Sequence, residues 1–564
     1  MKNIILWVLT LSGFNAYAGE PFITVGADDD NDCDYHTIQA AVDSGLSDTI
    51  RIASNKNYFE SIALLNSNNY LIGGYANCQM AGLNITDLSQ AIITGNGNDD
   101  VISINVVLSN NYDIKLKNII VANGFGGISA TSQNNAQLSL IIDGVRMFNN
   151  NYNGFKVLTF AGSDADVVLN DVIIDFNDSS GVVCEGSDSN IRVTGTSKIK
   201  DNTTSDKGAG LWVADGCQLT AYSPTIIENN QAQNNGGGMY VASGGDVTLW
   251  GLATGCENGI CYGVDDAPVI IRNNTGSIGG AIAINNEESS VTMANALVEN
   301  NVASIQGGAI SVSAGEMTGY TYLDGEKCWQ VGKCNQIINN KANFSGGAIY
   351  AEFNAKVDFY STWFKGNRAD KGVIVAVDGN STVTINNSMM VKNGDNGSGD
   401  YSDNNLFEIS SNAQNPNTAI TLEYVTVADN EVIDEVVKND EGSIRIHSSI
   451  INENVDVYAV TNHVLAQFEC LIVNETDSFS AGGTVMVATP EFMNPSNDDY
   501  RNKPSSVAVD YCYEITSDWY GDMEWDEHGF DDPNKINLHG SYDLGADEYI
   551  IDNDIIFKHG YEQD

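Results

Sequence analysis

The sequence is poor in positive charge. It contains 26 Lys and Arg residues against 74 Asp and Glu residues among its 564 positions, which gives a formal net charge of −48. A surface of this sign repels phosphate backbones and anionic headgroups, so neither nucleic acid nor an anionic membrane is expected as a partner. The acidity itself has two readings, a solvated soluble exterior or the binding of divalent cations.

Long apolar runs are missing beyond the first twenty residues. At the start, Lys2 precedes the run IILWVLTLSGF, and AYA ends at Ala18, which together predict a cleaved secretory signal peptide over residues 1–18. No later stretch reaches the roughly 18 apolar residues that a membrane span needs. We therefore expect an exported mature chain without a transmembrane segment.

The ten cysteines lack the spacing of a metal site, because no C-x-x-C pair occurs among them. In an exported chain they predict disulfides. Two pairs are close enough in sequence to close short loops, Cys256 with Cys261 and Cys328 with Cys334. Order along the chain alone predicts three further pairs: Cys33 with Cys78, Cys184 with Cys217, and Cys470 with Cys512.

Glycine clusters recur at a regular interval. The last glycine of each cluster falls at Gly127, Gly154, Gly181, Gly210, Gly238, Gly280, Gly308, Gly347 and Gly372. Six of the eight intervals measure 25 to 29 residues; the other two measure 42 and 39, and each contains one of the close cysteine pairs. This pattern predicts a repeat of about 27 residues with disulfide-closed insertions near 256–261 and 328–334.

Asparagines keep the same period, four to eight residues before each glycine, as in ENN before Val302. Short runs that alternate apolar and polar residues lie between, and these predict strands. Leucine-rich positions are absent and the period is too short for a propeller blade, so a parallel β-helix fits best. Asn would form left-handed corners and a hydrogen-bonded ladder, and Gly would form tight bends.

The chain ends depart from the repeat. Residues 19–80 are predicted to form an N-terminal cap, with a short helix over 37–44, and the first coils. The repeats are expected over 81–488. Residues 489–564 are irregular, acidic and aromatic, and we expect them to form a C-terminal closing segment.

Several of these segments resemble known families. GGAI at 279–282, 307–310 and 346–349, alternating with ENN-like turns, resembles the repeats of polymorphic outer-membrane proteins and other pectin-lyase-like β-helices. Residues 489–512, with YDLGADEY at 542–549, are similar to the ending of bacterial choice-of-anchor Q surface proteins. Thr489, Val507 and Cys512 stand where that pattern has Asp, Pro and Gly.

The resemblance implies an all-β, right-handed parallel β-helix on the surface of a bacterium or secreted from it. It also implies an adhesin-like protein. With the aromatic residues of its strands, we expect a non-enzymatic, adhesin-like or glycan-contacting role, with an extracellular glycan or a host or cell-surface protein as partner. The alternative is a polysaccharide lyase or glycoside hydrolase of the pectin-lyase-like class, acting on an acidic or neutral glycan. The N-T-D, G-H-G and R-I-K signatures of polygalacturonase-like enzymes do not occur. Fold alone does not decide between these roles.

Two sets of residues are site candidates. In the loop DDDNDCD, the carboxylates of Asp28, Asp30 and Asp32 alternate as calcium ligands can, although the Gly and distant Glu of an EF-hand are missing. Calcium is therefore the one cofactor that the sequence indicates. The candidate glycan contacts are aromatic residues on repeat strands: Trp212, Tyr240, Tyr350 and Tyr360.

Overall fold

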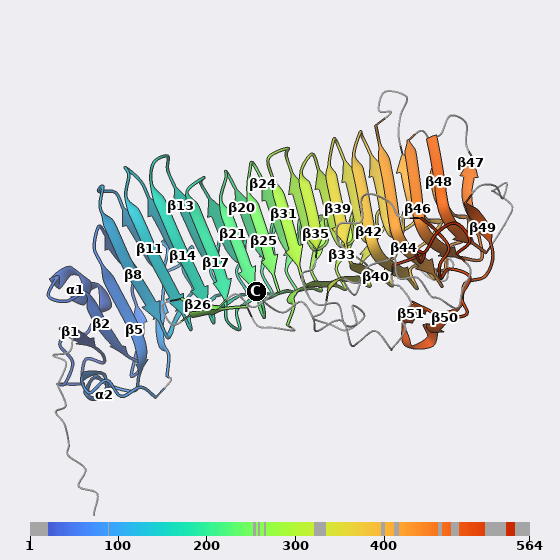
Figure 1. Cartoon of the computed structure of the whole chain (residues 1–564). Coiled ribbons are helices and arrows are strands. Elements are labelled where there is room, and N and C mark those ends of the chain that lie inside the picture. The colour runs from blue at the N-terminus through green and yellow to red at the C-terminus, as the bar shows by residue number, and fades with distance from the viewer. Residues whose placement is uncertain are drawn as a thin grey trace, which may run out of the picture.

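The computed structural model shows a long stack of parallel strands, with the first coils at one end and the last coils at the other (Figure 1). The residues that it describes are 21–87, 89–251, 255–257, 260–263, 267–320, 334–395, 401–410, 417–440, 442–460, 465–474, 484–513 and 537–546. The predicted signal peptide and Cys328 lie outside these residues. The all-β parallel β-helix predicted from the sequence is confirmed.

Two large sheets form the walls of the helix. Sheet B has 14 strands: β4 (Ile62–Leu65), β7 (Ile102–Val106), β10 (Ile128–Ser132), β13 (Phe155–Thr159), β16 (Val182–Glu185), β20 (Leu211–Ala214), β24 (Met239–Ala242), β30 (Ile282–Asn285), β34 (Ile310–Ser313), β38 (Ile349–Glu352), β41 (Val375–Asp378), β43 (Asn405–Ser410), β45 (Glu435–Asn439) and β47 (Asp456–Val460).

Sheet A has 28 strands in two rows that meet at a bend. The first row holds β1 (Phe22–Val25), β2 (Thr49–Ala53), β5 (Asn69–Tyr75), β8 (Asn111–Lys117), β11 (Gln137–Asp143), β14 (Asp164–Asn170), β17 (Ser189–Thr194), β21 (Gln218–Tyr222), β25 (Asp246–Trp250), β31 (Ser290–Ala294), β35 (Glu316–Tyr320) and β39 (Lys356–Tyr360). The second row holds β3 (Asn57–Phe59), β6 (Ala91–Thr94), β9 (Ile119–Ala122), β12 (Arg146–Phe148), β15 (Ile173–Asp175), β18 (Lys198–Lys200), β22 (Ile226–Glu228), β28 (Val269–Arg272), β32 (Ala296–Glu299), β36 (Asn335–Ile338), β40 (Thr362–Lys365) and β49 (Val485–Val487).

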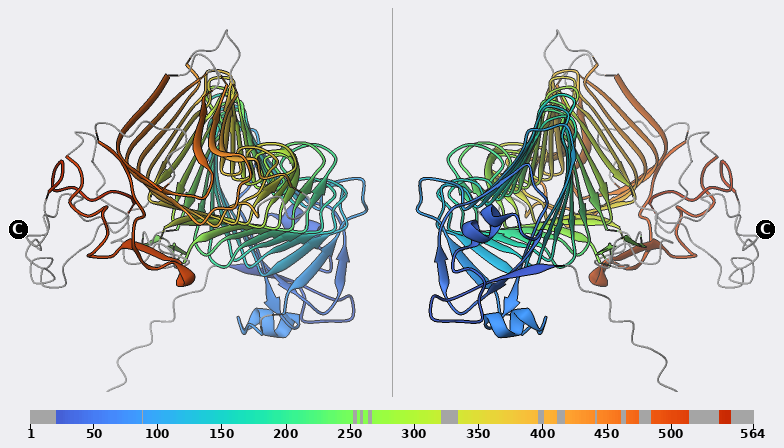
Figure 2. Two further views of the ribbon diagram at one scale, coloured as in Figure 1. Left: turned by 90° about the vertical axis from the view of Figure 1, so that its right-hand side faces the viewer. Right: turned by 90° about the vertical axis from the view of Figure 1, so that its left-hand side faces the viewer.

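The rows merge near the C-terminal end, where single strands run through both: β42 (Thr382–Val391), β44 (Ala419–Ala428), β46 (Ser443–Asn452) and β48 (Leu465–Val473). A small sheet C lies outside the main walls and contains β19 (Thr203–Thr204), β23 (Gln231–Ala232), β29 (Thr275–Ile278), β33 (Val302–Gln306) and β37 (Lys341–Ala342). Each coil thus runs from sheet B through both rows of sheet A and back, as the end-on views show (Figure 2).

One hydrophobic core fills the coils from Ile23 to Val473. Strand alternation sends every second side chain inward, so Ile, Val and Leu of successive coils stack on one another. Their burial drives the folding of each coil onto its neighbour, because a single coil cannot enclose its own apolar face.

The asparagine ladder predicted from the repeat is present. The Asn230 side-chain amide donates to the Asn274 Oδ1 (3.0 Å), and the Asn274 amide donates to the Asn301 Oδ1 (3.0 Å). The series continues, fully buried, from Asn150 to Asn430. The residue before each ladder asparagine takes the left-handed conformation, as at Asn300 (φ 55°). Each ENN motif therefore supplies one corner residue and one ladder residue.

The glycine pairs form the bend from each corner back into sheet B. Gly307 has φ +66°, and a Cβ there would lie 2.5 Å from the carbonyl oxygen of Ile310. Only glycine fits this close approach without strain. The bend holds the preceding loop tightly against the outer side of the next strand.

The N-terminal cap contains the predicted helix as α1 (Ile38–Ser44), whose N-cap Thr37 accepts a hydrogen bond from the Ala40 amide. A second short helix, α2 (Cys78–Gly82), follows β5 and was not predicted. No described helix has the length and apolarity that a transmembrane helix requires.

The three long-range disulfides predicted from cysteine order are confirmed: Cys33–Cys78, Cys184–Cys217 and Cys470–Cys512, with Cα–Cα distances of 5.1, 5.9 and 5.7 Å. Cys334 is also disulfide-bonded. In the first insertion, β26 (Gly255–Glu257) and β27 (Ile260–Tyr262) form an antiparallel pair whose register places Cys256 opposite Cys261.

The described part of the C-terminal segment lies along the flank of the last coils (Figure 2). It contains β50 (Phe492–Asn494), the 3₁₀ helix η1 (Pro495–Asn497) and β51 (Asp499–Asn502). Asp498 forms ion pairs with Lys365 and Lys392, and the Tyr500 hydroxyl donates to Asp429 (2.7 Å). These contacts cover the outer side of the second row of sheet A, which the sequence did not predict.

Candidate functional site

The loops that connect each ladder asparagine to the next glycine, which we call the arches, stand beside the outer face of sheet B, and the longer arches carry the strands of sheet C. Their lengths change along the stack. The arch from Asn177 to Gly181 spans four positions, whereas the next, from Asn202 to Gly210, spans eight. Where a short arch is followed by a long arch, the height of the row of arches beside sheet B changes. A cleft lies at this change.

This cleft, the arch cleft, has a volume of about 360 Å³. Its floor is an outward row of sheet B, in which Lys156 pairs with Val183 and Val183 with Trp212 on successive strands. Its rim is hydroxyl, amide and carboxylate groups of the arches and of sheet B: Asn153, Asp178, Ser179, Ser180, Glu185, Thr204, Ser205 and Asp206. The Lys156 ammonium lies 2.7 Å from the Glu185 carboxylate, so these two charges offset each other. Asp178 and Asp206 then give the cleft a net negative charge.

Trp212 lines the arch cleft, and Tyr240 on the next coil packs against it. Trp212 and Tyr240 occupy paired positions on β20 and β24, and their rings meet edge to face with centroids 5.7 Å apart. The Tyr240 hydroxyl accepts hydrogen bonds from Asn285 (3.0 Å) and Lys207 (3.3 Å). Tyr240 is therefore a buried support that fixes the half-buried Trp212 at the cleft.

The other two aromatic candidates do not join this pair. Tyr350 lies in the same outward row, but Ala283 and Ser311 separate it from Tyr240. Its hydroxyl donates to Glu352 (3.2 Å), and burial raises its pKa. Tyr360 lies on β39 of sheet A, so it faces away from sheet B. Of the four candidates, the structure brings only Trp212 and Tyr240 together.

Sheet B also carries an acidic group that the sequence analysis missed. The register of Ala351 with Val377 places Glu352 beside Asp378 on the neighbouring coil. Burial, and to a smaller extent the charge of Asp378, raise the pKa of Glu352. Nearby, Glu408 accepts from Asn405 (2.8 Å) and lies 3.6 Å from Lys371. Aligning the repeats on their GGAI motifs would have revealed these outward acids.

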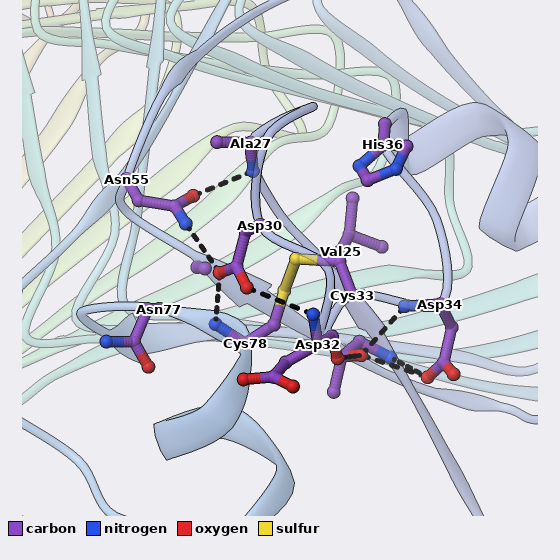
Figure 3. Close-up of a disulfide and its surroundings, with 12 residues drawn as sticks. Val25, Ala27, Asp30, Asp32, Cys33, Asp34, His36, Asn55, Asn77 and Cys78 are labelled. Atoms are coloured by element: carbon purple, nitrogen blue, oxygen red, sulfur yellow. Dashed lines mark hydrogen bonds between the residues drawn. A yellow bond between two sulfur atoms is a disulfide. The ribbon is translucent and has the colours of Figure 1, made fainter.

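The loop predicted to bind calcium uses its acids for other contacts (Figure 3). Asp28 forms a 3.0 Å ion pair with Lys56, which lowers the pKa of Asp28. Asp30 accepts from the Cys78 backbone amide (3.0 Å) and from the Asn55 side-chain amide (2.9 Å). These bonds fix the loop against the start of α2.

Among the described residues, one group of three potential metal-ligating side chains converges, and it joins Asp30 to Cys33 and Cys78. Those two sulfurs are bonded to each other and offer no thiolate. Asp28 and Asp32 do not belong to this group. Calcium at Asp28, Asp30 and Asp32 stays a prediction, and the geometry of the loop lends it no support.

A scan against protein-family models finds no match to this chain, and a search of curated proteins finds none either. The resemblances to polymorphic outer-membrane proteins and to choice-of-anchor Q proteins therefore stay predictions.

Proposed function

We propose that this protein is an exported, secreted or cell-surface β-helix that contacts a glycan through the arch cleft without transforming it, in an adhesin-like role. The observation that carries the proposal is Trp212, supported edge-on by Tyr240 beside a cleft rimmed with hydroxyl and amide groups. An aromatic side chain packs against the apolar face of a sugar ring, and the polar rim can bond its hydroxyls.

Charge favours an uncharged sugar in this cleft. Asp178, Glu185 and Asp206 outnumber Lys156, and Lys156 is already paired with Glu185. An anionic sugar would meet repulsion there, whereas neutral hydroxyls could donate to the carboxylates. Three disulfides support export, because such bonds persist in oxidising compartments.

Affinity electrophoresis against a panel of neutral polysaccharides tests the proposal. We expect Trp212→Ala to weaken retardation by the bound glycan about tenfold, since an anchoring aromatic side chain contributes much of the affinity of a small site. Trp250→Ala is the matched control, because Trp250 is a half-buried tryptophan on the outer face of sheet A. Absence of binding to every neutral glycan, or equal losses in both variants, would contradict the proposal.

The second candidate is a polysaccharide lyase or glycoside hydrolase, and Glu352 is the observation that favours it. A carboxyl group whose pKa is raised by burial and by a second carboxylate is suited to act as a general acid. Glu352 and Asp378 lie on adjacent coils of one strand face.

Release of new reducing ends or unsaturated uronates from acidic and neutral glycans, with and without calcium, tests this candidate. If the protein is an enzyme of this kind, Glu352→Gln should lower the rate by at least roughly a hundredfold. The control is Glu287→Gln, an exposed glutamate in the turn after β30. Glycan binding with no product formation would leave the non-enzymatic role standing.

A further inference from the structure

A second cleft lies on the outer face of sheet A, in the first coils of the helix, and we call it the cationic cleft. Its volume is about 530 Å³, and β2, β5, β8 and β11 form its floor. In one outward row Tyr70 pairs with Lys115 and Lys115 with Ile141; in the next, Arg51 pairs with Ile72 and Ile72 with Lys117. Three cations therefore gather around apolar and aromatic side chains.

The arginine of this cleft is held in place with donors to spare. The guanidinium of Arg51 lies 3.8 Å from the centroid of the Phe22 ring and donates one hydrogen bond to the carbonyl of Ala81 (2.7 Å). A guanidinium has five N–H donors, and within the described part of the chain Arg51 uses one of them in this bond, which leaves others able to meet a ligand. The stacking orders the side chain before any ligand arrives, which lowers the entropic cost of binding.

Lys115 makes no ion pair within the part of the chain that the structure describes, whereas Lys117 is paired with Asp143 (2.7 Å). Among the described residues, the acid that lines the cleft is Asp113, which accepts a hydrogen bond from the Tyr70 hydroxyl (2.7 Å). The local balance is positive in a protein whose net charge is −48. A positive cleft on so acidic a surface is complementary to an anionic ligand.

We propose that the cationic cleft binds a negatively charged oligosaccharide, one that carries carboxylate or sulfate groups. Arg51 on β2 and the two lysines on β8 are separated by two strand spacings, roughly 10 Å. A single sugar does not cover that distance with its charge, so the ligand is a chain with more than one anionic group. The Tyr70 ring, Ile72 and Ile141 give a sugar ring an apolar surface between the charged contacts.

This site is independent of the arch cleft, because it lies on the other sheet and has the opposite charge. The two clefts therefore separate two kinds of glycan, and failure of one proposal does not decide the other. The whole mature protein is the material for the test, with uncharged dextran as the neutral probe.

Calorimetric titration with a galacturonate oligomer, galacturonate monomer, dextran sulfate and dextran at low salt tests the inference. We expect an anionic polymer to bind, the monomer to bind at least tenfold more weakly than its oligomer, and dextran not to use this cleft. The carboxylated and sulfated probes identify which anion is preferred. Lys115→Glu should weaken the preferred anionic probe roughly tenfold or more, since it removes a charge-assisted contact and adds a repulsion.

The matched control is Lys198→Glu. Lys198 lies at the start of β18, is half-buried, and also makes no ion pair within the described residues. Lys198→Glu changes the net charge of the protein by the same amount as Lys115→Glu, so this control measures how far net charge alone weakens anion binding. The inference is overturned if neither anionic polymer binds better than dextran, or if both variants lose the same affinity.

Discussion

The arch cleft and the cationic cleft are both lined by outward-pointing side chains of β-strands, but the two clefts carry opposite charge. In the arch cleft, outward side chains of sheet B lie beside loops that carry Asp178 and Asp206. In the cationic cleft, outward side chains of sheet A are left open, and Arg51 and Lys115 reach its surface. The difference teaches that strands supply regular positions in this fold, while the connecting loops decide which positions stay accessible.

The arches also explain why sheet B buries residues that point outward. Tyr240, Ala283, Ser311 and Ala376 lie on the outer side of sheet B, yet each is less than 5% exposed. Positive-φ glycines such as Gly307 bring the arch against this row. The threonines in an outward row of sheet A, by contrast, stay half-exposed, as at Thr220 and Thr248.

The largest expected effect comes from removing one rung of the ladder under the arch cleft. Asn202 accepts from both the backbone and the side-chain amide of Asn177, and donates to the carbonyl of Ile174. Asn202→Ala removes these three bonds and the one that the Asn202 side-chain amide donates to the Asn230 Oδ1 (3.0 Å), so the free energy of unfolding should fall by about 3–5 kcal/mol. Urea denaturation measures the free energy of unfolding, and Asn343→Ala, at an exposed position of another arch, is the control.

The same variant sharpens the comparison between the clefts. Because Asn202 begins the long arch, glycan binding in the arch cleft should weaken in the folded variant, while anion binding in the cationic cleft should not change. A variant as stable as the wild type, or equal losses in both clefts, would show that the ladder does not hold the arch.

The second-largest expected effect concerns the pH dependence of stability, and it should leave ligand binding in both clefts unchanged. After Asn430 the next member of the ladder is Glu453, whose carboxyl group accepts from the Asn430 side-chain amide (2.6 Å). Burial raises the pKa of Glu453 to about 8. Between pH 4.5 and 8 the folded protein holds a proton that the unfolded chain has lost, so rising pH lowers the stability of the fold.

Glu453→Gln removes this proton uptake. Because the wild type loses up to roughly 1.4 kcal/mol of unfolding free energy per pH unit, and less close to each pKa, the variant should gain about 3.5 kcal/mol relative to it between pH 5 and pH 8. Urea denaturation at both pH values measures the change, and the exposed Glu287→Gln should show no such change. A wild-type-like pH profile in Glu453→Gln would refute the assignment.

The smallest expected effect concerns the bend of the long arch. Gly208 has φ +63°, and a Cβ there would lie 2.5 Å from the carbonyl oxygen of Leu211. Gly208→Ala should therefore cost about 2 kcal/mol and reduce binding in the arch cleft only. Gly82→Ala is the control, since a Cβ at Gly82 meets no atom within 4 Å. Thermal unfolding of the two variants compares them, and equal melting temperatures would contradict the role given to the bend.

The sequence by itself determined the parallel β-helix, because residues such as Asn300 and Gly308 recur wherever the same backbone conformation is required. A corner requires a left-handed residue, and a tight bend requires glycine, wherever the coil turns. The order of cysteines was enough for three disulfides, since pairs that lie close along a solenoid also lie close in space.

Only the tertiary structure decided the sites. Trp212 and Tyr360 look alike in sequence, but they lie on different sheets, and Arg51 gave no signal because its partners Phe22 and Ala81 come from other coils. Asp28 and Asp30 have the spacing of calcium ligands, yet the Asp28 carboxylate forms an ion pair with Lys56 and the Asp30 carboxylate accepts a hydrogen bond from the Cys78 amide. Local backbone geometry repeats along the chain and can be read from it, whereas a cleft depends on which side chains of separate coils meet.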